Sequence, residues 1–304
     1  MIHVFIVNPY AYRASRTEEL REHLAKMTNF EYYVFSTSNK GDEANLVRRI
    51  RKIFIGEHIR FYCCGGSGTL RNMMMGIQDF SDVELAFYPC GLTNDMLKVF
   101  GDKKNRFEHI DNLIYGDVYD VDYIKTNKGL AFNTLSVGMD SIVVKKIEDF
   151  RILATFGSQL PYYFAVLYAL FFCKNEEYII EAGDEEYNMV CSHFFFGNGR
   201  VLGGSLHFVE GNVNITDGVG HFRIIPKKNL FRRLAATSKL RKNKADSISG
   251  VIHGEVTNIK IRRKDGKPLD MNYDGELVTA DTIEATMVHK GMRFVLPRGM
   301  RFEE

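Results

Sequence analysis

The feature that most constrains the fold is a change of hydrophobic period near residue 115. Before it, short apolar runs alternate with segments of helical spacing, a pattern that predicts a parallel sheet covered by helices. The strand-like runs are His3–Val7, Tyr32–Phe35, Arg60–Cys64 and Glu84–Tyr88, and the helical segments are Glu18–Met27, Ala44–Ile53, Leu70–Ile77 and Asp95–Phe100.

After residue 115, strand-like segments dominate and predict an antiparallel β-domain. Two helices interrupt it: the apolar run Leu160–Cys173, too short to span a bilayer and expected to be buried, and a basic stretch at Lys227–Lys244. Glycine next to aspartate between alternating runs is a hairpin signal. Four hairpins are predicted on that basis, at Gly183-Asp184, Asp217-Gly218, Asp265-Gly266 and Asp274-Gly275.

Composition sets a few limits. The 304 residues are 45% hydrophobic, which is enough for two domains, and the formal net charge of +2 gives no reason to expect a nucleic-acid partner. The five cysteines include no CxxC pair and are expected to be reduced, buried thiols. Reduced thiols of this kind are typical of a cytosolic protein, so the protein is expected in the cytoplasm. The start, MIHVFIVNPY, lacks a basic region and is interpreted as a first strand and not as a signal peptide.

Three loops follow predicted parallel strands and should open at one edge of the sheet, where ligands bind. They are Asn8-Pro9, Gly65–Thr69 and Pro89–Asp95. The sequence Gly-Gly-Ser-Gly-Thr allows a phosphate to approach the backbone closely, and the helix after it adds positive potential. No Gly-Lys-Ser/Thr follows, so this is not a Walker A loop, and a flexible turn remains the alternative.

The motifs and their order resemble the diacylglycerol kinase catalytic family, which includes bacterial lipid kinases and sphingosine kinases and is related to NAD kinases. The specific pair is GGSGT at Gly65–Thr69 with PCGLTND at Pro89–Asp95. The other matches run through most of the chain. They are Asn8-Pro9, Thr37 before Gly41-Asp42, VGMD at Val137–Asp140, GNGRVLGG at Gly197–Gly204, TDG at Thr216–Gly218 and YDGE at Tyr273–Glu276.

The resemblance implies a fold and a domain organisation. It implies a three-layer, parallel α/β domain that binds nucleotide, made of residues 1–115 with 291–304. It further implies an antiparallel β-sandwich that binds the lipid substrate, made of residues 116–290. The implied activity is transfer of the ATP γ-phosphoryl group to a hydroxyl of a lipid such as diacylglycerol, with Mg²⁺.

Site residues follow from the same resemblance. Glu276 is implied as the general base, with Asp274 of the same motif, and Asp217 as a magnesium ligand with backbone carbonyls of Asn214 and Val219. By composition, the two Asp-Gly pairs at these positions are also ordinary turns. The residues implied to line the nucleotide are Asn8, Thr37, Gly65, Gly66, Ser67, Gly68, Thr69, Leu70, Arg71, Gly91, Leu92, Thr93, Asn94 and Asp95.

Four departures from the family pattern cluster at the nucleotide site. Ser67 replaces an aspartate, Arg71 and Asn72 replace an Asn-Glu pair, Leu92 replaces a threonine, and Tyr10–Arg13 replaces small residues. A serine is a poorer magnesium partner than a carboxylate.

Alternative functions therefore stay open. One is an active lipid kinase in which Arg71 or Asp95 takes over part of the lost role. Another is a pseudokinase that binds nucleotide or lipid without turnover, and a third is an enzyme similar to NAD kinase. The acceptor lipid and the oligomeric state are not fixed by the sequence, and a homodimer is compatible with it.

The basic stretch suggests a membrane partner. Between Lys227 and Lys244 there are eight Lys or Arg residues and no acidic residue, with Leu230, Phe231 and Leu234 at helical spacing. Such a helix binds anionic lipid surfaces, so peripheral contact with the inner membrane face is expected. The alternative is a solvated helix whose apolar residues pack on the β-domain.

Overall fold

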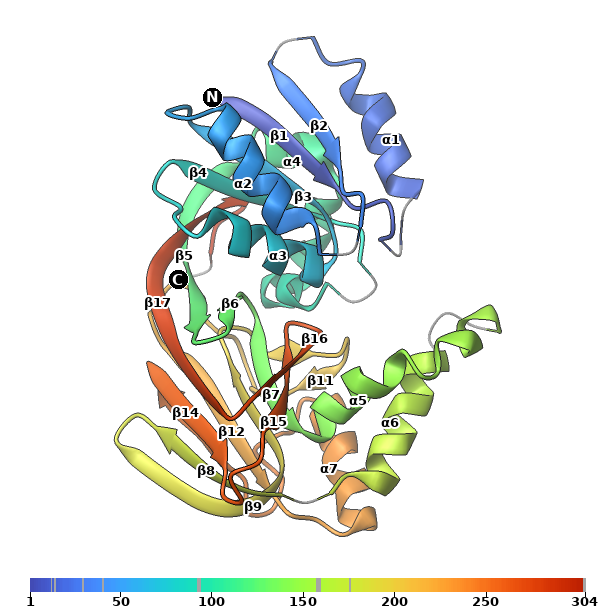
Figure 1. Ribbon diagram of the computed structural model, residues 1–304, viewed down its shortest axis with the longest axis vertical. Helices are drawn as coiled ribbons and strands as arrows, with labels where there is room; N and C mark the ends of the chain where they lie inside the picture. The colour runs from blue at the N-terminus through green and yellow to red at the C-terminus, as the bar shows by residue number, and fades with distance from the viewer. Residues whose placement is uncertain are drawn as a thin grey trace. The chain divides into compact units, whose positions relative to one another are not determined.

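The computed structural model describes residues 1–11, 13, 15–28, 30–39, 41–91, 94–156, 160–174 and 176–302 (Figure 1). The chain divides into two compact units. Unit 1 comprises Met1–Tyr123 and His289–Glu304, and unit 2 comprises Ile124–Val288. Two long strands, β5 (Asp117–Thr126) and β17 (Thr282–Leu296), carry the chain from one unit into the other.

Unit 1 is built on a parallel sheet in the order β4-β3-β1-β2. Every residue of β1, β3 and β4 is buried, as expected for central strands covered on both faces. The four strands predicted from the sequence are thereby confirmed. They are β1 (Ile2–Val7), β2 (Tyr32–Ser36), β3 (Ile59–Gly65) and β4 (Val83–Pro89).

The helices of unit 1 follow the predicted alternation. In α2, Leu46, Val47 and Ile50 are buried and form one apolar face, while basic side chains follow in the last turn. The end of β17 returns to this unit and pairs in parallel with β4, with Phe294 opposite Leu85. The helices are α1 (Ser15–Leu24), α2 (Glu43–Ile53), α3 (Ser67–Ile77), the 3₁₀ segment η1 (Asp95–Glu108) and α4 (Ile110–Ile114).

Unit 2 is an antiparallel β-sandwich, as expected. The long strand β9 belongs to both layers, because its first half pairs with β8 and its second half with β7 and β12. Side chains from both layers, such as Val137, Phe196 and Ile261, form one apolar core. The strands are β6 (Gly129–Ala131), β7 (Thr134–Gly138), β8 (Glu176–Ala182), β9 (Glu185–Gly197), β10 (Val201–Leu202), β11 (Leu206–His207), β12 (Gly220–Pro226), β13 (Ile252–Val256), β14 (Asn258–Arg263), β15 (Leu269–Tyr273) and β16 (Glu276–Ala280).

Two of the four predicted hairpins are present. Gly183-Asp184 joins β8 to β9, and Asp274-Gly275 joins β15 to β16. Asp274 and Gly275 have φ values of 50° and 95°, as a tight hairpin turn requires. The other two predictions are wrong. The turn at Asp217-Gly218 precedes β12, which pairs with β9 and β13, and β14 before Asp265-Gly266 pairs with β8 and β17. The residues of a turn determine where the chain reverses, but the packing of the whole sheet determines which strands pair.

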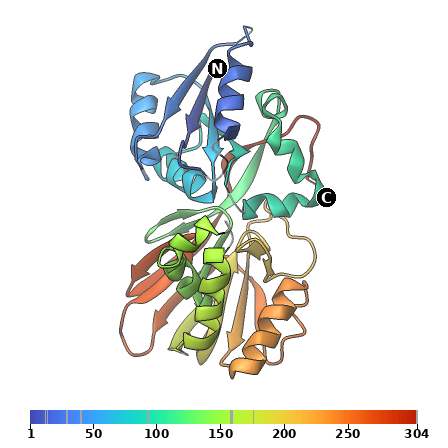
Figure 2. The same cartoon turned by 90° about the vertical axis from the view of Figure 1, so that its right-hand side faces the viewer.

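The helices of unit 2 lie on the outer side of the sandwich, with α6 and α7 side by side (Figure 2). In the part of the chain that the structure describes, no helix is long and apolar enough to cross a membrane. All five cysteines are buried and free, as predicted. The helices are α5 (Met139–Ile147), the 3₁₀ segment η2 (Arg151–Thr155), α6 (Leu160–Phe172) and α7 (Leu230–Arg241).

The prediction that the apolar run at 160–173 is a buried helix is only half right. The small residues Ala165 and Ala169 face the core beside α5, but large apolar side chains of α6 face outward. The prediction fails because the run is apolar on every face, whereas unit 2 covers only one side of the helix.

Candidate functional site

The three loops expected at one edge of the parallel sheet do lie together in unit 1. The amide of Asn8, after β1, donates to the carbonyl of Cys64 at 3.0 Å, and the amide of Cys90, after β4, donates to Gly65 at 2.8 Å. The amide of Arg13 also donates to Cys90, at 2.9 Å. These backbone bonds hold the first two loops and the start of the third at the carboxyl ends of β1, β3 and β4.

The glycines of the Gly65–Thr69 loop are needed by the packing of the protein itself. A Cβ on Gly65 would lie 2.6 Å from the side chain of Thr69, and one on Gly66 would lie 3.2 Å from the Cα of Gly91. Gly66 is the N-cap of α3, which begins at Ser67. The first amides of a helix have no partner within it, so this end of α3 offers donors to an anion.

Thr37 follows β2 and lies in the same unit. Its amide donates to the carbonyl of Val7 at 3.0 Å. The side chain is only 3% exposed, and its hydroxyl has no hydrogen-bond partner in the described protein. An unpaired buried hydroxyl costs stability unless something outside the protein pairs with it, so Thr37 suits a ligand contact.

Asn8, implied by the resemblance to line the nucleotide, makes several hydrogen bonds within unit 1. Its amide nitrogen donates to the hydroxyl of Thr69 at 2.9 Å and to Glu43 at 3.3 Å, and its amide oxygen accepts from the amide of Tyr10 at 2.9 Å. With these bonds made, the side chain of Asn8 ties the first loop to the start of α3.

Glu43 is the residue of this site that sequence reasoning missed. It is 1% exposed and accepts hydrogen bonds from Asn8 and, at 3.1 Å, from Asn72. Asn72 occupies the position where the resembled family has a glutamate, and Glu43 supplies a carboxylate against it from α2. A signal was available, since Glu43 directly follows the Gly41-Asp42 pair.

The remaining nucleotide-lining predictions differ in their surroundings. Leu70 is buried in the core, and Arg71 is nearly buried and contacts the side chain of Asn72. Asp95 forms an ion pair with Lys98 at 2.9 Å. Asn94 adopts the left-handed conformation, donates to the carbonyl of Gly91, and keeps a buried amide oxygen without a partner among the described residues. Leu92 and Thr93 lie outside the described residues.

Two arginines lie beside the loop that follows β4. Arg16 donates to the carbonyl of Pro89 at 3.1 Å, and Arg13 and Arg16 both pair with Glu108. Burial raises the pKa of Glu108, but hydrogen bonds from the two arginines outweigh this and hold that pKa below its ordinary value. Two guanidinium groups against one carboxylate leave one excess positive charge in this cluster beside the loop.

In unit 2, the predicted catalytic residues occupy the β15–β16 hairpin. The carboxylate of Asp274 is buried and accepts hydrogen bonds from the amides of Phe132, Asn133 and Thr134, the last at 2.8 Å. It therefore stabilises the connection between β6 and β7. Glu276 is the first residue of β16, half-buried and opposite Tyr273.

The predicted magnesium ligands lie in the turn before β12. Asp217 is exposed, and its carboxylate accepts from the amide of Val219 at 3.1 Å. The side-chain oxygen of Asn214 accepts two hydrogen bonds from Thr216, which leaves its backbone carbonyl as the candidate ligand. Among the residues that the structure describes, no three His, Cys, Asp or Glu side chains gather as a metal site.

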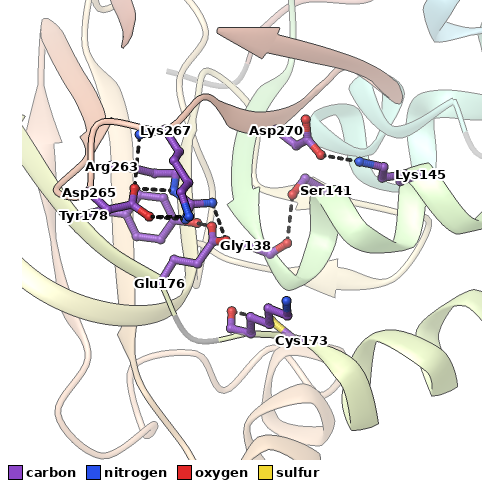
Figure 3. Close-up of polar contacts among 11 residues, drawn as sticks. Gly138, Ser141, Lys145, Cys173, Glu176, Tyr178, Arg263, Asp265, Lys267 and Asp270 are labelled. Carbon is purple, nitrogen blue, oxygen red and sulfur yellow. Dashed lines mark hydrogen bonds and ion pairs between the residues drawn. The ribbon is translucent and has the colours of Figure 1, made fainter. Parts of the chain in front are cut away.

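The charged residues around Arg263 in unit 2 form a cluster in which positive and negative side chains pair with one another. Arg263 pairs with Glu176 and Asp265, Lys267 pairs with Asp265, and Tyr178 donates to Glu176 (Figure 3). A hydrogen bond from Arg263 lowers the pKa of Asp265 to about 2. Opposite charges in contact stabilise the link between β8 and β14, and the cluster needs no ligand to balance it.

Comparison with known proteins agrees with this geometry. Residues 3–126 match the model of the diacylglycerol kinase catalytic domain. "Putative lipid kinase YtlR" of Bacillus subtilis (strain 168) is 25% identical over 217 residues, which are 64% of this chain and 70% of that protein. "Putative lipid kinase" of Staphylococcus carnosus (strain TM300) is 27% identical over 176 residues, which are 56% of this chain and 55% of the relative.

Solved structures show the same fold. A "putative diacylglycerol kinase" from Bacillus anthracis str. Sterne superposes with a TM-score of 0.73 over 96% of both chains at 19% identity. A second diacylglycerol kinase structure from the same organism gives 0.67 at 18% identity, again over 96% of both chains. The resemblance read from the sequence motifs is thereby confirmed: this chain has the fold of the solved diacylglycerol kinase structures, and its residues 3–126 match the model of the family's catalytic domain.

Proposed function

We propose that the protein is an ATP-dependent lipid kinase that phosphorylates a hydroxyl group of a lipid such as diacylglycerol. The observation that carries the proposal is the edge of unit 1 where the loops after β1, β3 and β4 are hydrogen-bonded together at the start of α3. That edge lies within the residues that match the diacylglycerol kinase catalytic domain.

The residues present fit a nucleotide. The start of α3 offers backbone donors to phosphate oxygens, Thr37 holds a buried hydroxyl in need of a partner, and Arg13 and Arg16 add positive charge. ATP supplies the phosphoryl group. We further propose that unit 1 binds the nucleotide and unit 2 the lipid, in keeping with the predicted domains 1–115 with 291–304 and 116–290.

The proposed roles in unit 2 concern the acceptor. Glu276 is proposed to accept the proton of the lipid hydroxyl, while Asp274 holds the hairpin in which Glu276 lies. Asp217 and the carbonyls of Asn214 and Val219 are proposed to hold Mg²⁺, since oxygen ligands suit that cation. The protein is proposed to act in the cytoplasm, at the inner membrane face.

Ser67 keeps the alternative of a pseudokinase open. It stands where the resembled family has an aspartate, and its hydroxyl is a weak partner for Mg²⁺. Glu43 places a carboxylate near α3, the helix that begins at Ser67, but its oxygens already accept hydrogen bonds from Asn8 and Asn72. A protein in this state would bind nucleotide or lipid without transferring phosphate.

The test is incubation with γ-labelled ATP, Mg²⁺ and a total lipid extract, followed by separation of the lipids. Wild type should label one lipid class, and Glu276→Ala should not. Calorimetric binding of ATP without any labelled lipid would favour the pseudokinase, and in that case Ser67→Asp should start or raise the transfer. If the protein neither binds ATP nor labels a lipid, the kinase and a nucleotide-binding pseudokinase are both refuted.

A further inference from the structure

The outer face of α6 carries large apolar side chains in contact with water. Five of them form what we call the α6 face: Tyr163, Phe164, Leu167, Phe171 and Phe172, with exposed fractions of 48%, 44%, 49%, 57% and 64%. Tyr163, Leu167 and Phe171 are four residues apart and so lie in one row along the helix. Contiguous exposed apolar surface of this kind marks an interaction site.

The core side of α6 is lined by Pro161, Ala165, Ala169 and Leu170, and Tyr162 and Val166 pack partly against the same cluster. The five residues of the α6 face are exposed, and α6 has no charged residue that would favour water on that side. Removing an aromatic side chain from water is more favourable in free energy than removing an alanine, so the α6 face is suited to contact with another apolar surface.

The neighbouring helix α7 also exposes apolar side chains. Arg233 of α7 donates to the carbonyl of Leu170 at 2.7 Å and fixes the two helices together. Phe231 is 81% exposed and Leu234 is 44% exposed, while Ala236 and Leu240 face the core. The sequence-based alternative, in which the apolar residues of this stretch all pack on the β-domain, is therefore wrong for Phe231 and Leu234.

Charges beside this surface are basic. Lys174 follows α6, and Lys227, Arg232, Arg241 and Lys242 on or next to α7 are exposed. Three acidic side chains near the ends of α5 and α6 are paired: Asp149 with Lys146, Glu176 with Arg263, and Glu177 with Lys264. Glu148, at the end of α5, is an exposed acidic residue on this side of unit 2. Of the eight basic residues in the stretch 227–244, Arg233 is buried and does not belong to the surface.

We propose that the α6 face, together with Phe231 and Leu234 of α7, docks on the surface of an anionic phospholipid bilayer, with the basic side chains against the lipid headgroups. Apolar insertion combined with basic flanks is the chemistry of interfacial helices. A symmetric dimer through this face would bring identical basic side chains toward each other, which favours the bilayer over a second copy. The docking proposal rests on the proposed function, because a lipid substrate is the reason for binding a bilayer. Its test measures vesicle binding and does not depend on kinase activity.

The experiment is co-sedimentation of the full chain with vesicles of phosphatidylcholine alone or with phosphatidylglycerol. Wild type should bind the anionic vesicles at least tenfold more strongly, and high salt should weaken the binding. The variant Leu167→Ser/Phe171→Ser/Phe172→Ser should lose at least tenfold in binding. Ile53→Ser/Ile55→Ser is the matched control, because these apolar residues of unit 1 are 68% and 84% exposed and lie outside the proposed surface.

A charge variant and a second measurement distinguish the possible results. Lys227→Gln/Arg232→Gln/Arg241→Gln/Lys242→Gln should weaken binding to anionic vesicles only. Sedimentation velocity shows whether two copies of the chain associate through this face. A wild-type dimer that the triple serine variant converts to a monomer would overturn the proposal. Equal vesicle binding by wild type and that variant would also overturn it. Vesicle binding without any phosphoryl transfer would instead refute the kinase function and leave the docking surface standing.

Discussion

The loop edge of unit 1 and the β15–β16 hairpin of unit 2 were both predicted from short motifs, but the two are built differently. The loop edge joins segments far apart in the sequence, such as Asn8 with Thr69 and Gly65 with Cys90. The hairpin is local, with Tyr273 opposite Glu276 across a two-residue turn.

The two regions also differ in which polar groups remain available. At the loop edge, Thr37 has an unpaired buried hydroxyl and α3 presents its first amides. At the hairpin, the most buried carboxylate, Asp274, already accepts three backbone hydrogen bonds. A motif residue whose bonds are satisfied within the protein is part of the scaffold, whereas an unsatisfied buried group points to a ligand. The following predictions test that distinction.

The largest effect is expected at Glu276. If it accepts the proton of the lipid hydroxyl, Glu276→Gln should lower the turnover number by about 10²–10⁴-fold, because general base catalysis contributes that much. Stability should change little, since the amide keeps the size of the carboxylate. Turnover and the urea unfolding midpoint are measured on the same preparation. Undiminished turnover would remove Glu276 from the mechanism.

The next effect is expected at the loop edge. Gly66→Val should weaken ATP binding by about 100-fold or more, since a side chain at Gly66 is forced against Gly91 and separates the two loops. Thr37→Val, which keeps the shape and removes the hydroxyl, should weaken it by roughly tenfold. Isothermal calorimetry measures both affinities, and unchanged values in both variants would place the nucleotide elsewhere.

A third prediction contrasts two aspartates of unit 2 in stability. Asp274→Asn should lower the free energy of unfolding by about 2–3 kcal/mol, because charge-assisted bonds to three buried amides are lost while asparagine tolerates the left-handed backbone. The exposed Asp217→Asn should change it by less than about 0.5 kcal/mol. Urea denaturation followed by circular dichroism compares them, and equal effects would contradict the structural role of Asp274.

A smaller effect is expected at Glu43. Glu43→Ala leaves Asn8 and Asn72 without their shared acceptor, so unit 1 should lose about 1–2 kcal/mol of stability and ATP affinity should fall several-fold. Adding Asn72→Glu returns a carboxylate to the same place and should restore most of both. Thermal unfolding and calorimetry provide the two readouts. If the double variant is no better than the single one, the two positions do not share one role.

The last effect concerns pH. Burial, aided by the charge of Arg60, lowers the pKa of His3 in unit 1 to about 4, and burial with Arg233 lowers that of His193 in unit 2 to about 3. The unfolded chain binds the proton near pH 6.5, so stability is constant above that pH and falls below it. At pH 5.5 each histidine should cost about 1.4 kcal/mol.

Histidine variants separate the contributions of the two units. Urea unfolding at pH 7.5 and 5.5 should show a smaller pH effect in His3→Asn and in His193→Asn than in wild type. If neither variant changes the pH effect, groups other than these histidines cause the acid sensitivity.

Much of unit 1 could be predicted because its information is local. The change of hydrophobic period determined the parallel strands, and the rule that ligands lie at the carboxyl ends of such strands determined which loops meet. Periodicity reports which side of a segment is buried, and turn residues report where the chain reverses. Those two signals were enough for β1, β3 and β4 and for the Asp274-Gly275 turn.

Tertiary structure alone decided what each polar or apolar residue touches. Glu43 bonds to Asn8 and Asn72, residues 35 and 29 positions away, and no local pattern encodes that choice. The same holds for the turns at Asp217 and Asp265, because the strands beside them pair with strands elsewhere in the sheet. It also holds for α6, because its apolar sequence does not indicate which side of the helix packs on the sandwich. A sequence pattern states that a group must be buried or paired, but its partner is set by which segments pack together in three dimensions.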